Sequence, residues 1–197
     1  MLPIRRSYLR LIKKDIIMKT ILTKEEMKIA YNVGKSRNDF CKNNNIFSGK
    51  HSSRSNFWID WNGAAGEIAF AKMMFESKVL TKKEFDLCIL KIQEGELKSA
   101  NLGLDDGDLS INNLNIDVKT SEYDFAHLWL TNNKRNTNKI DYYVLLTGNV
   151  DKSPSFELKG YLSHKTAMKN WNDTISGTPG KFHQKELKQN IFEGISE

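Results

Sequence analysis

Three ionisable residues, Asp108, Asp117 and Lys119, have types and spacing that could do chemistry. They lie in Asp106–Ser121, DGDLSINNLNIDVKTS, where polar and apolar residues alternate before and after two asparagines. Alternation with period two is typical of half-buried strands, and Asn112–Asn113 tolerates the positive φ angles that a two-residue hairpin turn needs. We therefore expect a hairpin that holds both carboxylates and the lysine on one face.

The length of the turn decides which residues of this hairpin face each other. If the turn is Asn112–Asn113, Asp108 lies opposite Asp117, about 4.5–5.5 Å away between Cβ atoms, where like charges repel. A longer loop, Asn112–Asn115, pairs Asp108 with Lys119 instead. The three groups share one face in both registers.

Two carboxylates held this close require a cation between them, or one of them must bind a proton. Oxygen ligands suit Mg²⁺ or Mn²⁺ better than zinc, which prefers histidine and cysteine. Lys119 beside such a metal could orient or deprotonate a water molecule, or stabilise negative charge that develops on a phosphate. The alternative is a solvated hairpin face that carries ordinary aspartates and a lysine.

Glu67 is a candidate third acid. It lies in Trp61–Phe75, WNGAAGEIAFAKMMF, which is rich in helix formers and predicts a helix that ends near Ser77. On helical spacing Glu67 falls on a mostly apolar stripe, where a carboxylate is costly unless it is paired. We expect this helix to pack against the hairpin and to deliver Glu67 to it. The alternative is a glutamate that reaches solvent at the edge of the stripe.

A helical glutamate, then a strand aspartate, then an Asp-Val-Lys triplet resemble the PD-(D/E)XK nuclease superfamily. This superfamily includes many restriction enzymes, Holliday-junction resolvases and phage nucleases. The sequence G-x-x-G-E-x-A-F-A-K, followed by D-G-D and I-D-V-K-T, is similar to small phage-type members. The matching residues here are Glu67, Asp108, Asp117, Val118 and Lys119.

The resemblance covers Gly63–Ser121 and is expected to continue through the next strands to Leu162. It implies an α/β fold that is restriction-endonuclease-like, with a mixed central sheet of four or five strands flanked by helices. One position departs from the pattern, because Gly107 stands before Asp108 where the superfamily often has proline.

The resemblance also implies roles for the matching residues. Glu67, Asp108 and Asp117, with the Val118 carbonyl, would bind Mg²⁺, or Mn²⁺ in its place. Lys119 would position the water that attacks the phosphorus, leaving a 5′-phosphate and a 3′-hydroxyl. The expected activity is therefore metal-dependent endonucleolytic hydrolysis of DNA.

Length and composition suit one domain, which we expect over residues 18–197 after a basic leader, 1–17, that need not be ordered. The leader carries +4 of the formal charge of +6, and Met18 is an alternative initiator. No apolar run reaches the ~20 residues that a membrane helix needs. Cys41 and Cys88 lack metal or redox spacing, so we expect free thiols in the cytoplasm, that of a host cell if a phage encodes the protein.

Capping and periodicity predict further elements. Capping boxes at Thr23 and Thr81 start two helices, the second of which ends at Gly95. The remaining predicted elements are a strand or bend at 125–131, strands at 141–150 and 156–162, and a short helix at 163–171.

Basic residues in two polar loops are candidate contacts to DNA phosphates. They are Lys50, Arg54, Lys134, Arg135 and Lys139. Ordinary solvated surface loops are the alternative. Expected partners are DNA, with RNA as a second choice, and a further copy of the chain, since many members of the superfamily act as dimers. Two other functions stay open: a nucleic-acid-binding module of the same fold without catalysis, and a related nuclease that acts on RNA.

Overall fold

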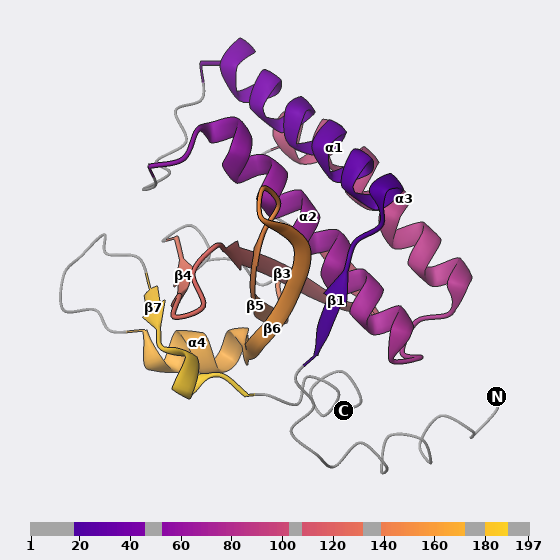
Figure 1. Cartoon of the computed structure of the whole chain (residues 1–197). Coiled ribbons are helices and arrows are strands. Elements are labelled where there is room, and N and C mark those ends of the chain that lie inside the picture. The colour runs from indigo at the N-terminus through magenta and orange to yellow at the C-terminus, as the bar shows by residue number, and fades with distance from the viewer. Residues whose placement is uncertain (1–17, 46–52, 103–107, 132–138, 172–179, 189–197) are drawn as a thin grey trace.

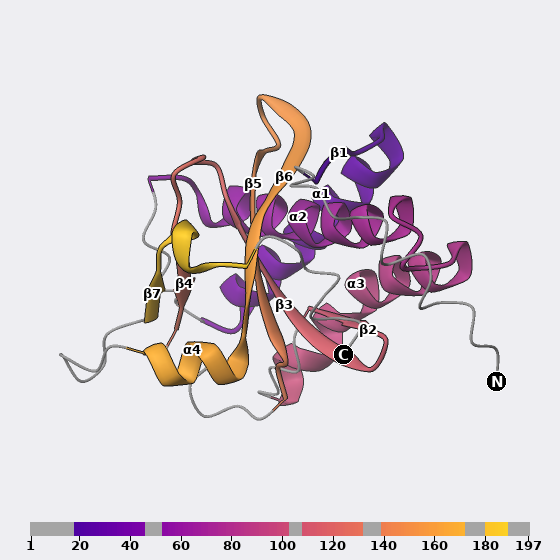
Figure 2. The same ribbon diagram turned by 90° about the horizontal axis from the view of Figure 1, so that it is seen from below.

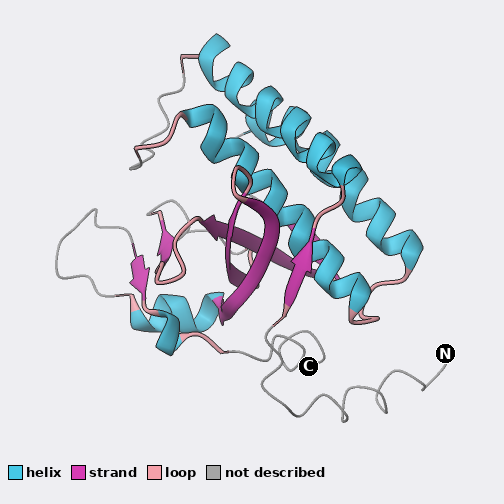
Figure 3. Cartoon of the chain, in the orientation of Figure 1, coloured by secondary structure: helices cyan, strands magenta, loops and turns pink. Residues whose placement is uncertain are grey.

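The computed structural model describes residues 18–45, 53–102, 108–131, 139–171 and 180–188, with side chains of the third helix described as far as residue 94. These residues form a mixed α/β structure, so the predicted class is confirmed (Figure 3). The helices are α1 (Lys24–Asn43), α2 (Asn56–Glu76), α3 (Lys82–Leu102), α4 (His164–Asn170) and the 3₁₀ helix η4 (Gln184–Glu186). The strands are β1 (Lys19–Ile21), β2 (Leu109–Ile111), β3 (Leu114–Ser121), β4 (Leu128–Leu130), β5 (Tyr142–Asn149), β6 (Ser153–Ser163) and β7 (Gly180–Phe182).

Five strands form the main sheet, in the order β1-β6-β5-β3-β2. β3 and β5 run parallel, whereas the other neighbouring pairs are antiparallel. The prediction of a mixed sheet of four or five strands is therefore confirmed. β3 lies next to the edge strand β2, which has only three residues against the eight of β3. The edge of β3 beyond β2 therefore has no strand partner on that side among the described residues.

Helix α2 is the central element of the fold. It packs against α1 and α3 and against β1, β3, β5 and β6, so that the three long helices cover one face of the sheet (Figure 1). Every residue from 64 to 71 of α2 is buried. A helix that is surrounded on all sides belongs to a core rather than to an amphipathic surface. The predicted packing of this helix on the sheet is confirmed.

The other face of the sheet carries a smaller layer made of α4 and a second antiparallel sheet, β4–β7 (Figure 2). Trp171 and Phe182 of this layer share a hydrophobic cluster with Tyr143 and Leu145 of β5. The alternate β5 residues, Val144 and Leu146, belong to the cluster beneath the helices. β5 is therefore buried on both faces, as strands in the middle of such sheets are.

Both predicted capping boxes are present. The Thr23 hydroxyl accepts from the Glu26 amide at 3.2 Å, and the Thr81 hydroxyl accepts from the Glu84 amide at 3.3 Å. The predicted end of the second helix at Gly95 is wrong, because α3 continues to Leu102. An interior glycine costs a helix about 1 kcal/mol relative to alanine, which good helix formers on either side can offset.

Short strands were the elements that the sequence did not predict. β1 and β7 have three residues each, too few to show a period of two. The segment predicted as a strand or bend at 125–131 contributes the three-residue β4, which belongs to the small sheet. No described helix is long and apolar enough to cross a membrane.

Candidate active site

The hairpin has the register of the two-residue turn. Asn112 and Asn113 have φ angles of 52° and 66°, and Leu109 pairs with Ile116. The longer loop, which would have paired Asp108 with Lys119, is therefore wrong. Asp108 directly precedes β2, and its amide donates to the Ile116 carbonyl at 2.9 Å. Asp108 and Asp117 therefore lie opposite each other, just before the first residue of β2.

Asp117 and Lys119 lie on the face of β3 that points away from α2. Ile116 and Val118 belong to the cluster beneath the helices, so alternation directs Asp117 and Lys119 to the other face. Asp117 is 0% exposed, and its carboxylate forms an ion pair with the Lys119 ammonium, whose side chain is 35% exposed. The Lys119 side chain thus extends from the buried carboxylate of Asp117 to the protein surface.

Asp108 lies at the edge of β3, where β2 has ended. Its carboxylate accepts from the Val118 amide at 2.6 Å and so satisfies a backbone donor beyond β2. Burial raises the pKa of Asp108 well above its ordinary value, and the negative charges of Glu67 and Asp117 raise this pKa further. Lys119 and Arg37 oppose these effects. Charged side chains from both faces of the sheet therefore influence the pKa of Asp108.

Glu67 is buried, at 3% exposure, so the alternative of a glutamate that reaches solvent is wrong. Its two carboxylate oxygens accept from the Arg37 guanidinium of α1 at 2.6 and 2.8 Å. This two-bond geometry is the strongest that arginine makes with a carboxylate. Arg37 thus compensates a charge that would be costly in this core helix.

Two glycines allow α2 to approach its neighbours closely. A Cβ at Gly34 of α1 would lie 2.5 Å from the Trp61 Cα, and a Cβ at Gly66 would lie 1.8 Å from the Thr120 Oγ1 of β3. Gly34 is one turn from Arg37, and Gly66 precedes Glu67. The same small residues that bring the backbones together therefore position the Arg37–Glu67 pair beside β3.

The donor chemistry of the three acids fits a hard divalent cation. They supply only carboxylate oxygens, and their mutual repulsion, seen in the raised pKa of Asp108, would be relieved by a cation among them. In the described part of the chain, no group of three or more His, Cys, Asp or Glu side chains is arranged to hold a metal ion. The three acids instead contact Arg37, the Val118 amide and Lys119.

Of the five predicted phosphate contacts, the two that the structure describes lie at opposite ends of β3. Lys50, Lys134 and Arg135 lie outside the described residues. Lys139 is exposed at the start of the strand, where its carbonyl accepts from the Asn115 side chain at 2.8 Å. Arg54 lies at the far end, where it pairs with Glu122, just after the last residue of β3.

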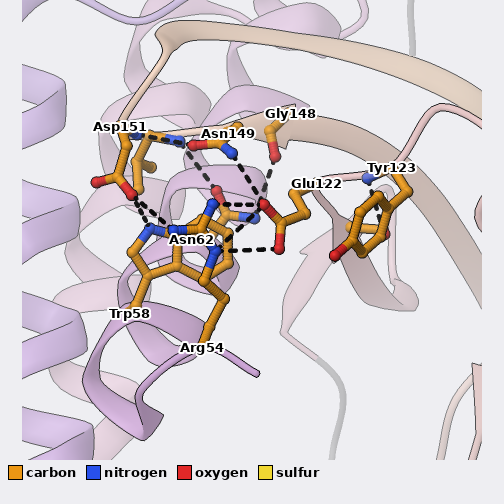
Figure 4. Close-up of polar contacts among 10 residues, drawn as sticks. Arg54, Trp58, Asn62, Glu122, Tyr123, Gly148, Asn149 and Asp151 are labelled. Atoms are coloured by element: carbon orange, nitrogen blue, oxygen red, sulfur yellow. Dashed lines mark hydrogen bonds and ion pairs between the residues drawn. The ribbon is translucent and has the colours of Figure 1, made fainter. Parts of the chain in front are cut away.

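Arg54 is part of a polar network that joins α2 to the strand ends (Figure 4). Its guanidinium donates to Glu122 at 2.7 Å and lies 4.6 Å from the centre of the Trp58 ring. The Trp58 indole donates to Asp151 at 2.6 Å, and Asn62 bonds to the backbone of the β5–β6 turn. This network fixes the start of α2 against the end of β3. A role of Arg54 in DNA binding stays a prediction.

Arg37 is the residue of the site that the sequence did not reveal. It follows Ala30 and Gly34 by seven and three residues, so it falls on the buried stripe of α1. A cation on a buried stripe requires an acid, just as Glu67 on an apolar stripe requires a cation. That complementarity is the signal that could have found it.

No family model matches the chain, and neither the curated proteins nor the solved structures gave a significant match.

Proposed function

We propose that the protein is a divalent-metal-dependent nuclease that hydrolyses phosphodiester bonds in DNA, with a restriction-endonuclease-like fold. The observation that carries the proposal is the raised pKa of Asp108, since Glu67 and Asp117 contribute to it from different elements and Lys119 lies beside them. Strongly perturbed acids are typical of sites that bind metals or transfer protons. The order of a helical glutamate, an aspartate and an Asp-x-Lys strand also supports it.

In this proposal, the chain supplies ligands and a cation. Glu67, Asp108 and Asp117 would hold Mg²⁺ with the Val118 carbonyl, and Arg37 would keep Glu67 in place from the outer side. The metal, when bound, polarises the scissile phosphate and makes its water more acidic. Lys119 orients the attacking water and offsets the charge on the phosphate, and the products carry a 5′-phosphate and a 3′-hydroxyl.

Cleavage of a substrate panel tests the activity. Supercoiled plasmid, linear duplex, a four-way junction, and single-stranded DNA and RNA are incubated with Mg²⁺, Mn²⁺ or EDTA. Wild type should cut at least one DNA only with metal, whereas Asp117→Asn and Lys119→Ala should lose the activity by on the order of a hundredfold or more. Asp86→Asn, which removes an exposed carboxylate of α3, is the matched control and should cut like wild type. Cutting by Asp117→Asn at the wild-type rate would refute the assignment.

A second candidate is a nucleic-acid-binding module without catalysis. It is favoured by the contacts that each acid already makes within the chain, to Arg37, to the Val118 amide and to Lys119. The same panel separates the two functions, because a module of this kind would bind DNA but leave every substrate intact. Cleavage of RNA with no cleavage of DNA would instead favour the related ribonuclease.

A further inference from the structure

Three large aromatic side chains are exposed within the eight residues that follow β3. Tyr123, Phe125 and Trp129 are 51%, 78% and 50% exposed. The Tyr123 and Phe125 rings stack on each other with centroids 5.6 Å apart, and Figure 4 shows Tyr123 to the side of the Arg54 network. Exposed aromatic groups that are gathered in this way mark interaction sites more often than isolated ones do.

The small sheet places a lysine beside Trp129, and the η4 segment after it is hydrogen-bonded to the turn that carries Tyr123 and Phe125. Leu128 and Leu130 are fully buried, so alternation places Trp129 on the outer face of β4, opposite Lys181 of β7. The Lys181 ammonium lies 5.2 Å from the centre of the Trp129 ring. The Gln184 amide donates to the carbonyls of Asp124 and Ala126 at 2.6 and 2.9 Å, and so ties the aromatic turn to the same layer.

The chemistry of this surface suits unpaired nucleobases. Each base has a flat face that stacks on an exposed aromatic ring, and a nearby lysine attracts the phosphates. In a duplex the faces of the bases are already stacked on each other, so such rings have little to bind. Residues 180–188 contain three lysines and one glutamate, and Lys159 lies 3.8 Å from Asp124, the acid between the two stacked rings.

The turn that carries Tyr123 and Phe125 lies within reach of the candidate site. Tyr123 and Phe125 follow Lys119 by four and six residues, so their Cα atoms lie at most about 14 and 22 Å from it. A nucleic-acid strand advances about 3.4 Å per nucleotide when stacked, so a few nucleotides bridge this distance. A strand held on the rings could therefore continue into the site.

We propose that Tyr123, Phe125, Trp129 and Lys181 bind an unpaired DNA strand next to the candidate site, so that the substrate class is single-stranded or branched DNA. This inference rests on the proposed nuclease function. It is tested by binding alone, in EDTA and with the Asp117→Asn protein, so that no cleavage is required. The probes are fluorescein-labelled oligothymidine, a blunt duplex, the same duplex with a single-stranded tail, and oligouridine.

Oligothymidine and the tailed duplex should bind more tightly than the blunt duplex. Phe125→Ala and Trp129→Ala should each weaken their binding by roughly tenfold or more, whereas Trp129→Phe should retain most of it. Leu90→Ala removes a side chain of α3 that is equally exposed, and should leave binding unchanged. Oligothymidine should also quench the part of the tryptophan fluorescence that Trp129→Phe removes.

The inference would be overturned if blunt and tailed duplexes bound equally well and neither alanine variant changed their binding, even if wild type cuts DNA. So would sedimentation that shows a dimer for wild type and a monomer for Phe125→Ala, since the rings would then face a second copy. Binding of oligouridine without oligothymidine would overturn the choice of DNA. Binding lost in the alanine variants, with no cleavage by wild type in any metal, would support the surface and refute the nuclease instead.

Discussion

Asp108 is the residue whose pKa the other charged groups of the candidate site influence. Its pKa is raised above that of an unfolded chain, so the folded state binds this proton more tightly. The stabilising effect of the proton is fully present below the unfolded-state pKa and is lost as the pH rises through the folded-state pKa. At pH values above the unfolded-state pKa, Asp108 therefore costs stability, which a bound cation would restore.

Asp108→Asn should accordingly stabilise the metal-free protein at neutral pH. The amide oxygen can still accept from the Val118 amide, while the like-charge repulsion with Glu67 and Asp117 disappears. Thermal unfolding measured across the acidic to neutral range should show a smaller loss of stability with rising pH than in wild type. Each ~1 kcal/mol gained would raise the melting temperature by about 2–4 °C. A variant that melts below wild type at neutral pH would contradict this role.

Arg37 should stabilise the protein mainly by compensating the buried charge of Glu67. Arg37→Gln leaves the carboxylate of Glu67 buried without its ion partner, which should cost on the order of 3 kcal/mol in urea unfolding. The double variant Arg37→Gln with Glu67→Gln, compared with each single variant, removes both charges and should recover much of that loss. Lys35→Gln breaks an exposed pair on the same helix and should change little. Additive losses in the double variant would show that the two residues do not act as a pair.

At the scale of elements, the distance between α2 and β3 decides where Glu67 lies. Gly66→Ala would put a Cβ 1.8 Å from the Thr120 Oγ1 and 2.9 Å from the Thr120 Cβ, so one element must move. We expect a loss of about 1–3 kcal/mol in stability together with a loss of cleavage.

Gly63→Ala is the matched control for this substitution, one turn earlier on the same helix. Its Cβ would meet only the Arg37 Nη1, at 3.9 Å, which is an ordinary contact. It should stabilise the helix by about 0.5–1 kcal/mol and preserve activity. Equal effects of the two alanines would contradict the close approach of α2 to β3.

The elements with strong local signals could be predicted from the sequence. The hairpin at Asn112–Asn113 was predicted with two registers left open, of which the two-residue turn is correct, and the starts of α1 and α3 followed from their capping boxes at Thr23 and Thr81. β1 and β7 could not be predicted, because their hydrogen bonds are made to strands that are distant in the sequence. The end of α3 was missed because a glycine weakens a helix without ending it.

At the scale of the molecule, the helical layer and the sheet that it covers bring the candidate site together. α2 contributes Glu67 from one face, β3 contributes Asp117 and Lys119 on the other, and Asp108 lies at the edge between them. The acids could be picked out from the sequence by their types. Arg37 could not, because its place depends on how closely α1 packs on α2 at Gly34, which is a property of the fold.

Direct titration of metal is the measurement that tests this account most closely. Mg²⁺ and Mn²⁺ are titrated calorimetrically into wild type, into Glu67→Gln, Asp108→Asn and Asp117→Asn, and into the control Asp86→Asn. We predict saturable binding by wild type and by the control, and binding weakened at least tenfold in each of the three site variants. Binding that none of the three substitutions affects, or no binding by wild type, would contradict a metal site formed by these acids.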